Sequence, residues 1–338
     1  METVVKKYQI ARVELLGGDY EGIPMEMDYG KRQVLSNVTY LEPGDLILVN
    51  VGSRSDGVLV VYFVDFVRIN QLLLLTGIFI SVILLISLWK GLRSLISMAF
   101  SLLVIIRYII PHILAGEDPV MVSIIGSVIL LGVTLYLTYG WTPKTHAAVV
   151  SMILVLFITG ALAGLSVLFT RLTGTGNESS LFLMQLLNAQ INLRGLLLGG
   201  MIIGALGVLD DLVTTQAAAV FELHYANTSL GFRRLFQAAM RIGQDHVAAT
   251  VNTLVLAYAG ASLPTLLLFS LARGDYGMLV NFEFVAEEIV RTLVGSLGLV
   301  LAVPLTTAIA ILFAFRADSL PEQDHSFHSS MGHSHSTE

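Results

Sequence analysis

The strongest constraint on this chain is a series of apolar segments of similar length. Crossing the hydrocarbon core of a bilayer takes about 20 apolar residues in a helix. Only 13% of the residues are charged and 55% are hydrophobic, whereas about a quarter of the residues in soluble domains are charged. The sequence therefore predicts a polytopic α-helical membrane protein with about seven transmembrane helices. We expect these helices at residues 70–89, 94–112, 119–139, 146–169, 195–220, 247–271 and 287–315.

Composition also excludes several classes of protein. The net charge is −6 and there is no run of lysine or arginine, so no nucleic-acid partner is expected. Without cysteine, neither a disulfide framework nor thiolate chemistry is available. Residues 1–33 are polar and lack the apolar core of a cleavable signal peptide, so the first span should direct insertion. The lipid bilayer is thus the main predicted partner, and no cofactor is expected.

Residues 1–69 predict a small β-rich domain ahead of the spans. Short runs rich in Val, Ile and Tyr are separated by turn residues, among them Gly17-Gly18 and Pro43-Gly44. This pattern is typical of a compact β-barrel or β-sandwich. A structural cap is the favoured role, because no pattern in this part points to a ligand and a fold alone gives no function.

The basic residues of the short loops predict the orientation of the chain. They concentrate on one side, which should face the cytoplasm of a bacterial inner membrane. The N-terminus and the β-rich domain would then lie outside, the seven-helix domain would occupy residues 70–316, and the C-terminus would lie inside. The basic residues on the predicted cytoplasmic side are Lys90, Arg93, Lys144, Arg233, Arg234, Arg241 and Arg316.

The C-terminal segment, residues 317–338, is polar and contains several histidines. We interpret it as a disordered cytoplasmic tail. Its histidines could bind Zn²⁺ or Ni²⁺ loosely, but their spacing fits no fixed site, so a tail without metal is an equally good interpretation. These histidines are His325, His328, His333 and His335.

Two further segments connect spans. Residues 172–192 contain TGTGNESS and predict an outer loop that leads into a short helix. Residues 227–243 start with Asn-Thr-Ser, which favours a helix N-cap, and then separate apolar from basic side chains. This predicts an amphipathic helix in the headgroup zone on the cytoplasmic side. The alternative is a positively charged topology anchor without a further role.

The most informative chemical feature is a pair of adjacent aspartates, Asp210 and Asp211, inside a membrane-length apolar segment. One aspartate at the centre of a transmembrane helix costs about 2.5–3.5 kcal/mol to insert, so two in succession rarely persist without a use. Held out of water, the two should exchange protons as a coupled pair. The alternative is that both reach the cytoplasmic headgroups. The uncharged run between Asp211 and Glu222 counts against it.

Small residues around this pair predict close helix packing. Asp210 lies about 100° around the helix from Asp211, and Thr214 follows Asp210 one turn further along. Small residues on one face let a neighbouring helix approach closely. Three glycines share a face with the second aspartate at spacings of 4, 3 and 4 residues: Gly200, Gly204, Gly207 and Asp211.

The next predicted span carries a stripe of polar and small residues, which we expect to face the acidic helix and to offer donors to the carboxylates. Asn252 points elsewhere and would serve a second neighbour. Ordinary helix packing is an equal alternative for Thr250 and Thr253. Function is favoured for His246 and Asn252, which are uncommon at depth. The stripe falls within about 100° and includes His246, Thr250, Thr253, Ala257 and Gly260.

Other polar residues carry weaker signals. Glu287, Glu288 and Arg291 at the start of the last span predict an ion pair at i,i+3 or i,i+4 near the outer surface, with a structural role. The sequence has no GxGD aspartyl-protease motif, no HExxH pair and no serine nucleophile elbow. We therefore do not expect an enzyme, and no catalytic residue is assigned.

Two motifs resemble a known family. GALGVLDDLVTTQ and the later GQDHVAATVNTLVLAYAGASLP are similar to the YibE/F family of bacterial multispanning membrane proteins. The resemblance extends over about residues 30–315 and includes a KGLR turn at residues 90–93. It implies a β-rich external head followed by membrane helices.

A more distant resemblance is to the transmembrane half of RND permeases, including the SecD/SecF export factors. Residues 195–315 are similar in order: an acidic helix, a cytoplasmic amphipathic connector and two further spans. The resemblance implies that the last five to six helices are RND-like, and that Asp210 and Asp211 match proton-relay carboxylates. This chain departs from that pattern in having no large periplasmic insert, a single copy of the repeat, and no lysine where many drug pumps pair one with the aspartates.

The leading hypothesis is therefore a proton- or ion-coupled, permease-like inner-membrane protein. The alternative is a non-transporting envelope assembly or export helper whose β-rich head binds a partner. A single repeat also implies that a homo-oligomer or a second membrane subunit completes any transport path. The predicted coupling site consists of Asp210, Asp211, Thr214, His246, Thr250, Asn252 and Thr253.

Overall fold

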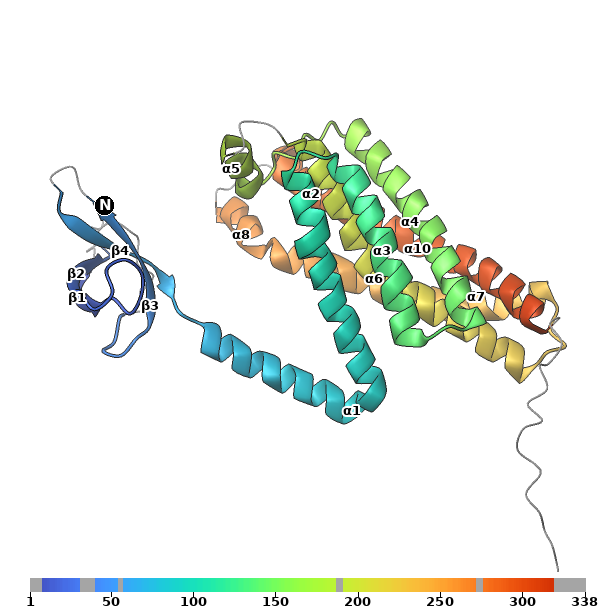
Figure 1. The fold of residues 1–338 in the computed structure, drawn as a ribbon. Coiled ribbons are helices and arrows are strands. Elements are labelled where there is room, and N and C mark those ends of the chain that lie inside the picture. Colours follow the sequence, from blue (N-terminus) through green and yellow to red (C-terminus); the bar gives the residue numbers. More distant parts are fainter. Residues whose placement is uncertain (1–7, 31–39, 54–56, 187–190, 272–275, 319–338) are drawn as a thin grey trace, which may run out of the picture. The chain divides into compact units, whose positions relative to one another are not determined.

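The structure is a computed structural model that describes residues 8–30, 40–53, 57–186, 191–271 and 276–318. The chain divides into two compact units, residues 1–88 and residues 89–338. Figure 1 shows the strands of the first unit and the packed helices of the second. The strands are β1 (Gln9–Glu14), β2 (Pro24–Tyr29), β3 (Ile47–Ser53) and β4 (Leu59–Phe66).

The first unit contains a four-stranded sheet with strand order β1-β2-β4-β3. β1 pairs with β2 and β3 pairs with β4, both antiparallel, and a parallel pairing of β2 with β4 at Met27 and Val61 joins them. Met27, Tyr29 and Val61 form the core, and the Phe63 ring stands edge-on to Tyr29 at 4.7 Å. The turn between β1 and β2 needs glycine at Gly18 and Gly22, which have φ of 90° and 79°.

The predicted barrel or sandwich is replaced by a single sheet in the described residues. Closing a barrel would require β1 to pair with β3, and both are edge strands of this sheet. After β4, Asp65 forms an ion pair with Arg68 at 2.8 Å. In this ion pair the Arg68 guanidinium donates a hydrogen bond to Asp65, which holds the pKa of the Asp65 carboxyl below its usual range.

A long helical segment follows the sheet. It consists of α1 (Ile69–Val104), a π-helical turn η1 (Ile105–Ile109) and α2 (Ile110–Leu114). The interruption expected at residues 90–93 is present two residues earlier, at Leu88, with φ 46° and ψ −126°, while residues 90–93 themselves are helical. Lys, Leu and Arg are good helix formers, and Gly91, the one poor helix former in KGLR, is buried and remains helical.

The second unit is a bundle of helices whose starts carry side-chain caps. Asp118 accepts from the amides of Val120 and Met121, Thr142 accepts from Thr145, and Asn192 accepts from Gly195. These caps begin α3, α4 and α6. The helices are α3 (Pro119–Tyr139), α4 (Pro143–Phe169), α5 (Glu178–Leu186), α6 (Leu193–Ala226), α7 (Phe232–Ala261), α8 (Leu263–Leu271), α9 (Tyr276–Leu279) and α10 (Glu283–Asp318). The predicted short helix in residues 172–192 corresponds to α5.

α6 is the central helix of this bundle, because it packs on α3, α4, α7 and α10. Its side chains Leu209, Leu212 and Phe221 are buried, together with Leu299 and Ile311 of α10. α10 also packs along α4 and α7. The acidic pair therefore lies in a helix that packs against four others.

Five helical segments in the described residues are long and apolar enough to cross a membrane. The segment predicted at 247–271 is not among them, because it is divided between α7 and α8. The amphipathic helix predicted at 227–243 is present from Phe232, but it does not end at residue 243, because α7 runs without a break to Ala261. Gly243, at the predicted end of that helix, is buried and remains helical. The five segments are Ile69–Leu114, Pro119–Tyr139, Pro143–Phe169, Leu193–Ala226 and Glu283–Ala317.

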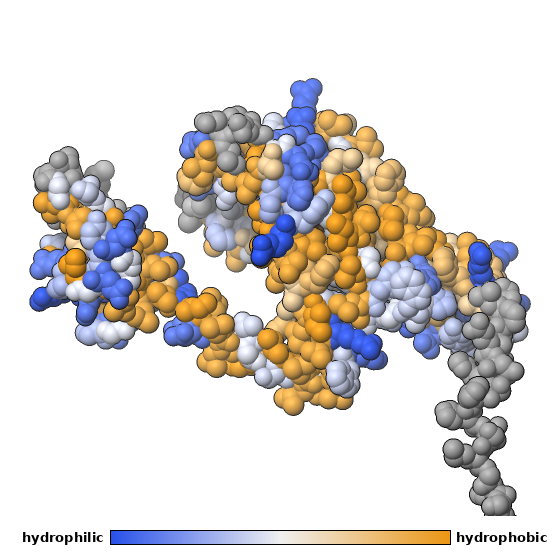
Figure 2. Space-filling model, in the orientation of Figure 1, coloured by the Kyte–Doolittle hydropathy of each residue, from blue (hydrophilic) through white to orange (hydrophobic). Residues whose placement is uncertain are grey.

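The surface of the second unit is apolar, as lipid contact requires. Large side chains such as Phe157, Leu165 and Phe169 are exposed, Phe169 by 90%. Figure 2 shows apolar residues over much of the visible face of these helices. Soluble proteins rarely expose apolar patches of this extent. The unit is therefore suited to a bilayer.

Candidate functional site

The acidic pair lies near the middle of α6. Asp210 is 17 residues beyond Leu193, about 26 Å along the helix axis. Its side chain is half-buried, and one carboxyl oxygen, Oδ1, is buried without a hydrogen-bond partner in the described part of the chain. Asp211 is exposed on the surface of this chain. The two carboxyl groups, adjacent in sequence, thus occupy different environments.

Thr214 supports the backbone beside the pair and makes no contact with the carboxylates. Its hydroxyl donates to the carbonyl oxygen of Asp210 at 2.8 Å and approaches that of Asp211 at 3.2 Å. The Tyr139 hydroxyl at the end of α3 lies 3.5 Å from the Thr214 hydroxyl. Since Thr214 follows Asp210 by four residues, both lie on the side of α6 that faces α3.

The polar stripe of α7 is not brought onto this pair. His246 and Thr250 are half-buried, while Asn252 and Thr253 are exposed. The two threonine hydroxyls donate within their own helix, to the carbonyls of His246 at 2.9 Å and of Ala249 at 3.0 Å. No hydrogen bond or ion pair joins these four residues to the acidic pair in the described residues.

Helix geometry explains the separation for Asp210. α6 meets α7 at a crevice where Gly204, Ala205 and Val208 face Leu254 and Tyr258. Asp210 is two residues beyond Val208, so it points about 200° away from that contact. Asp211 is three residues beyond Val208 and lies on the same side of α6 as the crevice, yet it shares no hydrogen bond with α7 in the described residues.

The glycines predicted to mediate close packing have open surroundings in this chain. A Cβ added at Gly200, Gly204, Gly207 or Gly260 would meet no atom within 4 Å. Close approaches occur at other glycines. A Cβ at Gly199 would lie 2.3 Å from Ser123 Oγ of α3, and one at Gly298 would lie 2.6 Å from Thr159 Oγ1 of α4. A packing role for the four predicted glycines stays a prediction that needs a second chain.

A second acidic site lies at the start of α10, where Glu283 and Glu287 bind the outer loop at residues 173–176. The sequence analysis did not predict this contact. Glu283 accepts hydrogen bonds from residues 173–175: the Gly174 amide at 2.9 Å, the Thr173 hydroxyl at 2.7 Å and the Thr175 hydroxyl at 3.2 Å. The Thr173 amide also donates to it. Glu287 is only 4% exposed and accepts from the Gly176 amide at 3.1 Å.

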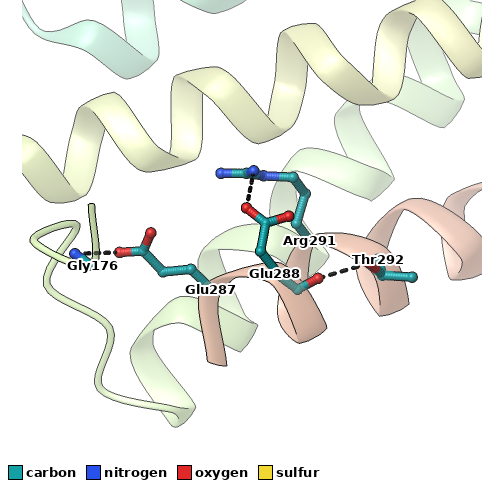
Figure 3. Close-up of polar contacts among 5 residues, drawn as sticks. All are labelled: Gly176, Glu287, Glu288, Arg291 and Thr292. Carbon is teal, nitrogen blue, oxygen red and sulfur yellow. Dashed lines mark hydrogen bonds and ion pairs between the residues drawn. The ribbon is translucent and has the colours of Figure 1, made fainter. Parts of the chain in front are cut away.

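Figure 3 shows how the neighbouring charges are arranged. Glu287 points toward Gly176 of the loop, while Glu288 forms an ion pair with Arg291 at 2.5 Å. The expected i,i+3 pair is therefore formed by Glu288 and Arg291. The Thr292 hydroxyl donates back to the Glu288 carbonyl at 2.7 Å. These acids hold the loop and the helix end together.

Two glycines make this loop possible. Gly174 has φ 84°, and a Cβ there would lie 2.3 Å from the carbonyl oxygen of Leu193. A Cβ at Gly176 would lie 2.7 Å from the carboxyl carbon of Glu287. The alternating TGTG sequence was the available signal. Its partners lie about 110 residues away, so spacing alone could not identify them.

Gln216 was also missed by the sequence analysis. It is 2% exposed, and its Nε2 donates to the Ala239 carbonyl of α7 at 3.0 Å and to the Thr307 hydroxyl of α10 at 2.7 Å. One side chain thus joins three helices. Further along α6, His224 is buried with its ring 5.3 Å from that of Phe315. A glutamine inside an apolar run was the signal for the first of these contacts.

A cavity of about 200 Å³ lies beside Thr214. It is lined by Tyr139, Lys144, Thr145 and Thr215 as well, which come from α3, α4 and α6. No group of three or more His, Cys, Asp or Glu side chains in the described residues could hold a metal ion. The tail histidines, His325, His328, His333 and His335, lie outside the described residues.

Comparisons with known proteins identify the family. The family model described as YibE/F-like protein matches residues 75–316, which contain α3 to α7, nearly all of α10 and both acidic sites. Neither the curated proteins nor the solved structures yielded a match. The matched region includes the central helix with its aspartate pair and covers most of the chain. This chain therefore belongs to the YibE/F-like protein family.

Proposed function

We propose that this protein is a proton- or ion-coupled, permease-like protein of a bacterial inner membrane, with Asp210 and Asp211 as its coupling site. The observation that carries the proposal is the buried Oδ1 of Asp210, which has no hydrogen-bond partner in the described residues and lies next to a second carboxyl group. Buried polar groups are nearly always hydrogen-bonded, and exceptions call for an explanation. The explanation we propose is that this carboxyl group binds and releases a proton.

The energy available to such a pair is sufficient for mechanical work. Moving one charge through the membrane potential is worth about 2.3 kcal/mol per 100 mV. Protonation of Asp210 would remove the cost of an unpaired buried charge and would favour a tighter arrangement of α6 against its neighbours. In this proposal, Thr214 positions the helix backbone, whereas His246, Thr250, Asn252 and Thr253 act only if α6 and α7 rearrange.

The remaining features of the proposal are those that the sequence analysis predicted. They include seven crossings. The 46-residue segment Ile69–Leu114, interrupted at Leu88, crosses twice because about 69 Å of helix exceeds a core of about 30 Å. Residues 247–271, divided between α7 and α8, cross once, and the other four long segments cross once each. The N-terminus lies outside and the C-terminus inside. The later helices act as in RND permeases, a second copy or another membrane subunit completes the path, and the protein performs no enzymatic reaction.

The test is proton flux into proteoliposomes that contain the full chain, followed with a pH-sensitive dye under an imposed membrane potential. We expect Asp210→Asn and Asp211→Asn to reduce the flux to the level of empty liposomes. Glu222→Gln is the matched control, because Glu222 is an exposed acid on the same helix and should keep wild-type flux. Wild-type flux in both aspartate variants would rule out the proton relay.

A second candidate function, an assembly or export helper, is favoured by one observation in the first unit. A groove of about 550 Å³ runs between β1 and β3, the two edge strands of the sheet, and is bordered by residues 41–46. Exposed strand edges can pair with an extended segment of another protein. Deleting residues 1–65 would separate the two functions: loss of the cellular phenotype with intact flux in liposomes would favour the helper.

A further inference from the structure

The cavity beside Thr214 has one charged group and walls that are otherwise neutral. Lys144 in the first turn of α4 is its one charged lining residue, and four lining residues carry hydroxyl groups: Tyr139, Thr145, Thr214 and Thr215. None of the lining residues is acidic. Ala148 and Ala218 complete the wall, and their small side chains leave the volume of about 200 Å³ open.

Lys144 is half-buried and forms no ion pair in the part of the chain that the structure describes. The two carboxyl groups nearest in sequence to the cavity wall are those of Asp210 and Asp211, and Thr214 contacts only their backbone carbonyls. A partly desolvated ammonium group without a counter-ion favours binding of an anion. The residues that line the cavity therefore supply no negative group to pair with the Lys144 ammonium group.

The cavity lies at the level of the membrane boundary. α3 has 21 residues, so it spans about 31 Å and matches a hydrocarbon core of about 30 Å. The turn after it carries an aromatic cluster: the rings of Tyr136 and Trp141 stack at 4.4 Å, and the Tyr136 hydroxyl lies 2.8 Å from His146 Nδ1. Tyrosine and tryptophan concentrate at membrane–water interfaces.

We propose that this cavity binds the phosphate group of an anionic phospholipid. The Lys144 ammonium would pair with the phosphate, the Tyr139 hydroxyl at the cavity mouth would donate to it, and the alanine-lined wall would contact the start of an acyl chain. Lysine binds phosphate as a point charge, and basic pockets between membrane helices bind lipid headgroups. The same phosphate chemistry could come from a soluble phosphate. The site does not depend on whether Asp210 moves protons.

The test uses the full chain purified in detergent and analysed by native mass spectrometry after addition of phosphatidylglycerol or phosphatidylcholine. Inorganic phosphate is tested separately by thermal shift. Lys144→Gln removes the charge, and Lys90→Gln is the matched control because Lys90 is exposed and outside the cavity. Ala218→Leu fills the cavity while Lys144 is kept. Size-exclusion elution at the wild-type volume confirms that each variant is folded.

We expect wild type and Lys90→Gln to retain phosphatidylglycerol, and Lys144→Gln and Ala218→Leu to retain about tenfold less, with phosphatidylcholine lost from all four. A thermal shift with inorganic phosphate that disappears in Lys144→Gln, without selective retention of phosphatidylglycerol, would keep the phosphate site and assign it to a soluble ligand. Equal retention by Lys144→Gln and Lys90→Gln, together with no Lys144-dependent phosphate shift, would overturn the proposal.

Discussion

The two acidic sites of this protein differ in how their carboxyl groups are satisfied. Glu283 at the start of α10 accepts several hydrogen bonds from residues 173–175, and the buried Glu287 accepts one from Gly176. Asp210 in the middle of α6 has a buried oxygen with no such bond in the described residues. A carboxylate held by several donors keeps one protonation state and one position. The comparison therefore separates acids that hold the fold together from an acid that is free to change.

The largest loss of stability is expected from a substitution that prevents the loop at residues 173–176 from adopting its conformation against Glu283. Gly174→Ala places a Cβ 2.3 Å from the Leu193 carbonyl oxygen at a φ of 84°. We expect it to lower the free energy of unfolding by about 3 kcal/mol or more, because both the backbone conformation and the contact are lost. The measurement is thermal unfolding in detergent, followed by the fluorescence of Trp89 and Trp141.

Gly164→Ala is the control for this substitution. A Cβ there would meet nothing within 4 Å and Gly164 lies inside α4, so alanine should be neutral or should stabilise by up to about 1 kcal/mol. If Gly174→Ala unfolded at the same temperature as Gly164→Ala, the loop would not be a structural element of the α10 site.

Gln216 tests whether an uncharged side chain with hydrogen bonds to other helices also stabilises the fold. Gln216→Leu keeps the volume and removes the donor to the Ala239 carbonyl and the Thr307 hydroxyl. We expect a loss of about 2 kcal/mol, since two hydrogen bonds of a buried side chain are removed. Combining Gln216→Leu with Thr307→Val should recover part of this loss in the same unfolding assay. A double variant with fully additive losses would show that the two side chains are not coupled.

Glu283→Gln should have a smaller effect. The amide keeps one acceptor oxygen for the loop but loses the negative charge, so we expect a loss of about 1–2 kcal/mol. Limited proteolysis within residues 173–176 should become faster, because the loop is held less firmly. Unchanged stability and unchanged proteolysis would mean that the hydrogen bonds of Glu283 contribute no stability.

The smallest loss of stability is expected for Asp210→Asn. No hydrogen bond of Oδ1 is lost and the cost of an unpaired buried charge is removed, so the free energy of unfolding should be equal to or higher than that of wild type, while we expect proton flux to be abolished. The comparison with Glu283→Gln in the same detergent checks this directly. A loss as large as that of Glu283→Gln would assign Asp210 to the structural group and remove the basis for its role in coupling.

Much of the helical architecture could be predicted from local sequence. The span expected at residues 119–139 coincides with α3, and the short helix in the outer loop was found as α5. The pair of Glu288 and Arg291 follows from their spacing on one helix. In each case the signal and its partner lie within a few residues of each other, so helix geometry is sufficient.

Other features depended on distant partners. The four donors from residues 173–175 to Glu283 bridge about 110 residues, and no periodicity encodes that distance. α7 continues through Gly243 because this glycine packs against Val303 and Gln216, a contact that suits its lack of a side chain. The polar stripe of α7 was expected at both carboxylates, but Asp210 lies on the opposite side of α6 from Gly204 and Val208, the residues that meet α7.

The sequence by itself determined that this chain forms long helices suited to a bilayer, because in hydrocarbon each backbone group must be hydrogen-bonded within its own segment and long apolar runs can do so only as helices. It also identified the acidic pair as costly and therefore informative. The tertiary structure alone decided which polar groups found partners. Glu283 and Gln216 have partners on other segments, whereas Asp210 Oδ1 has none among the residues that the structure describes, because such contacts depend on which helix faces meet.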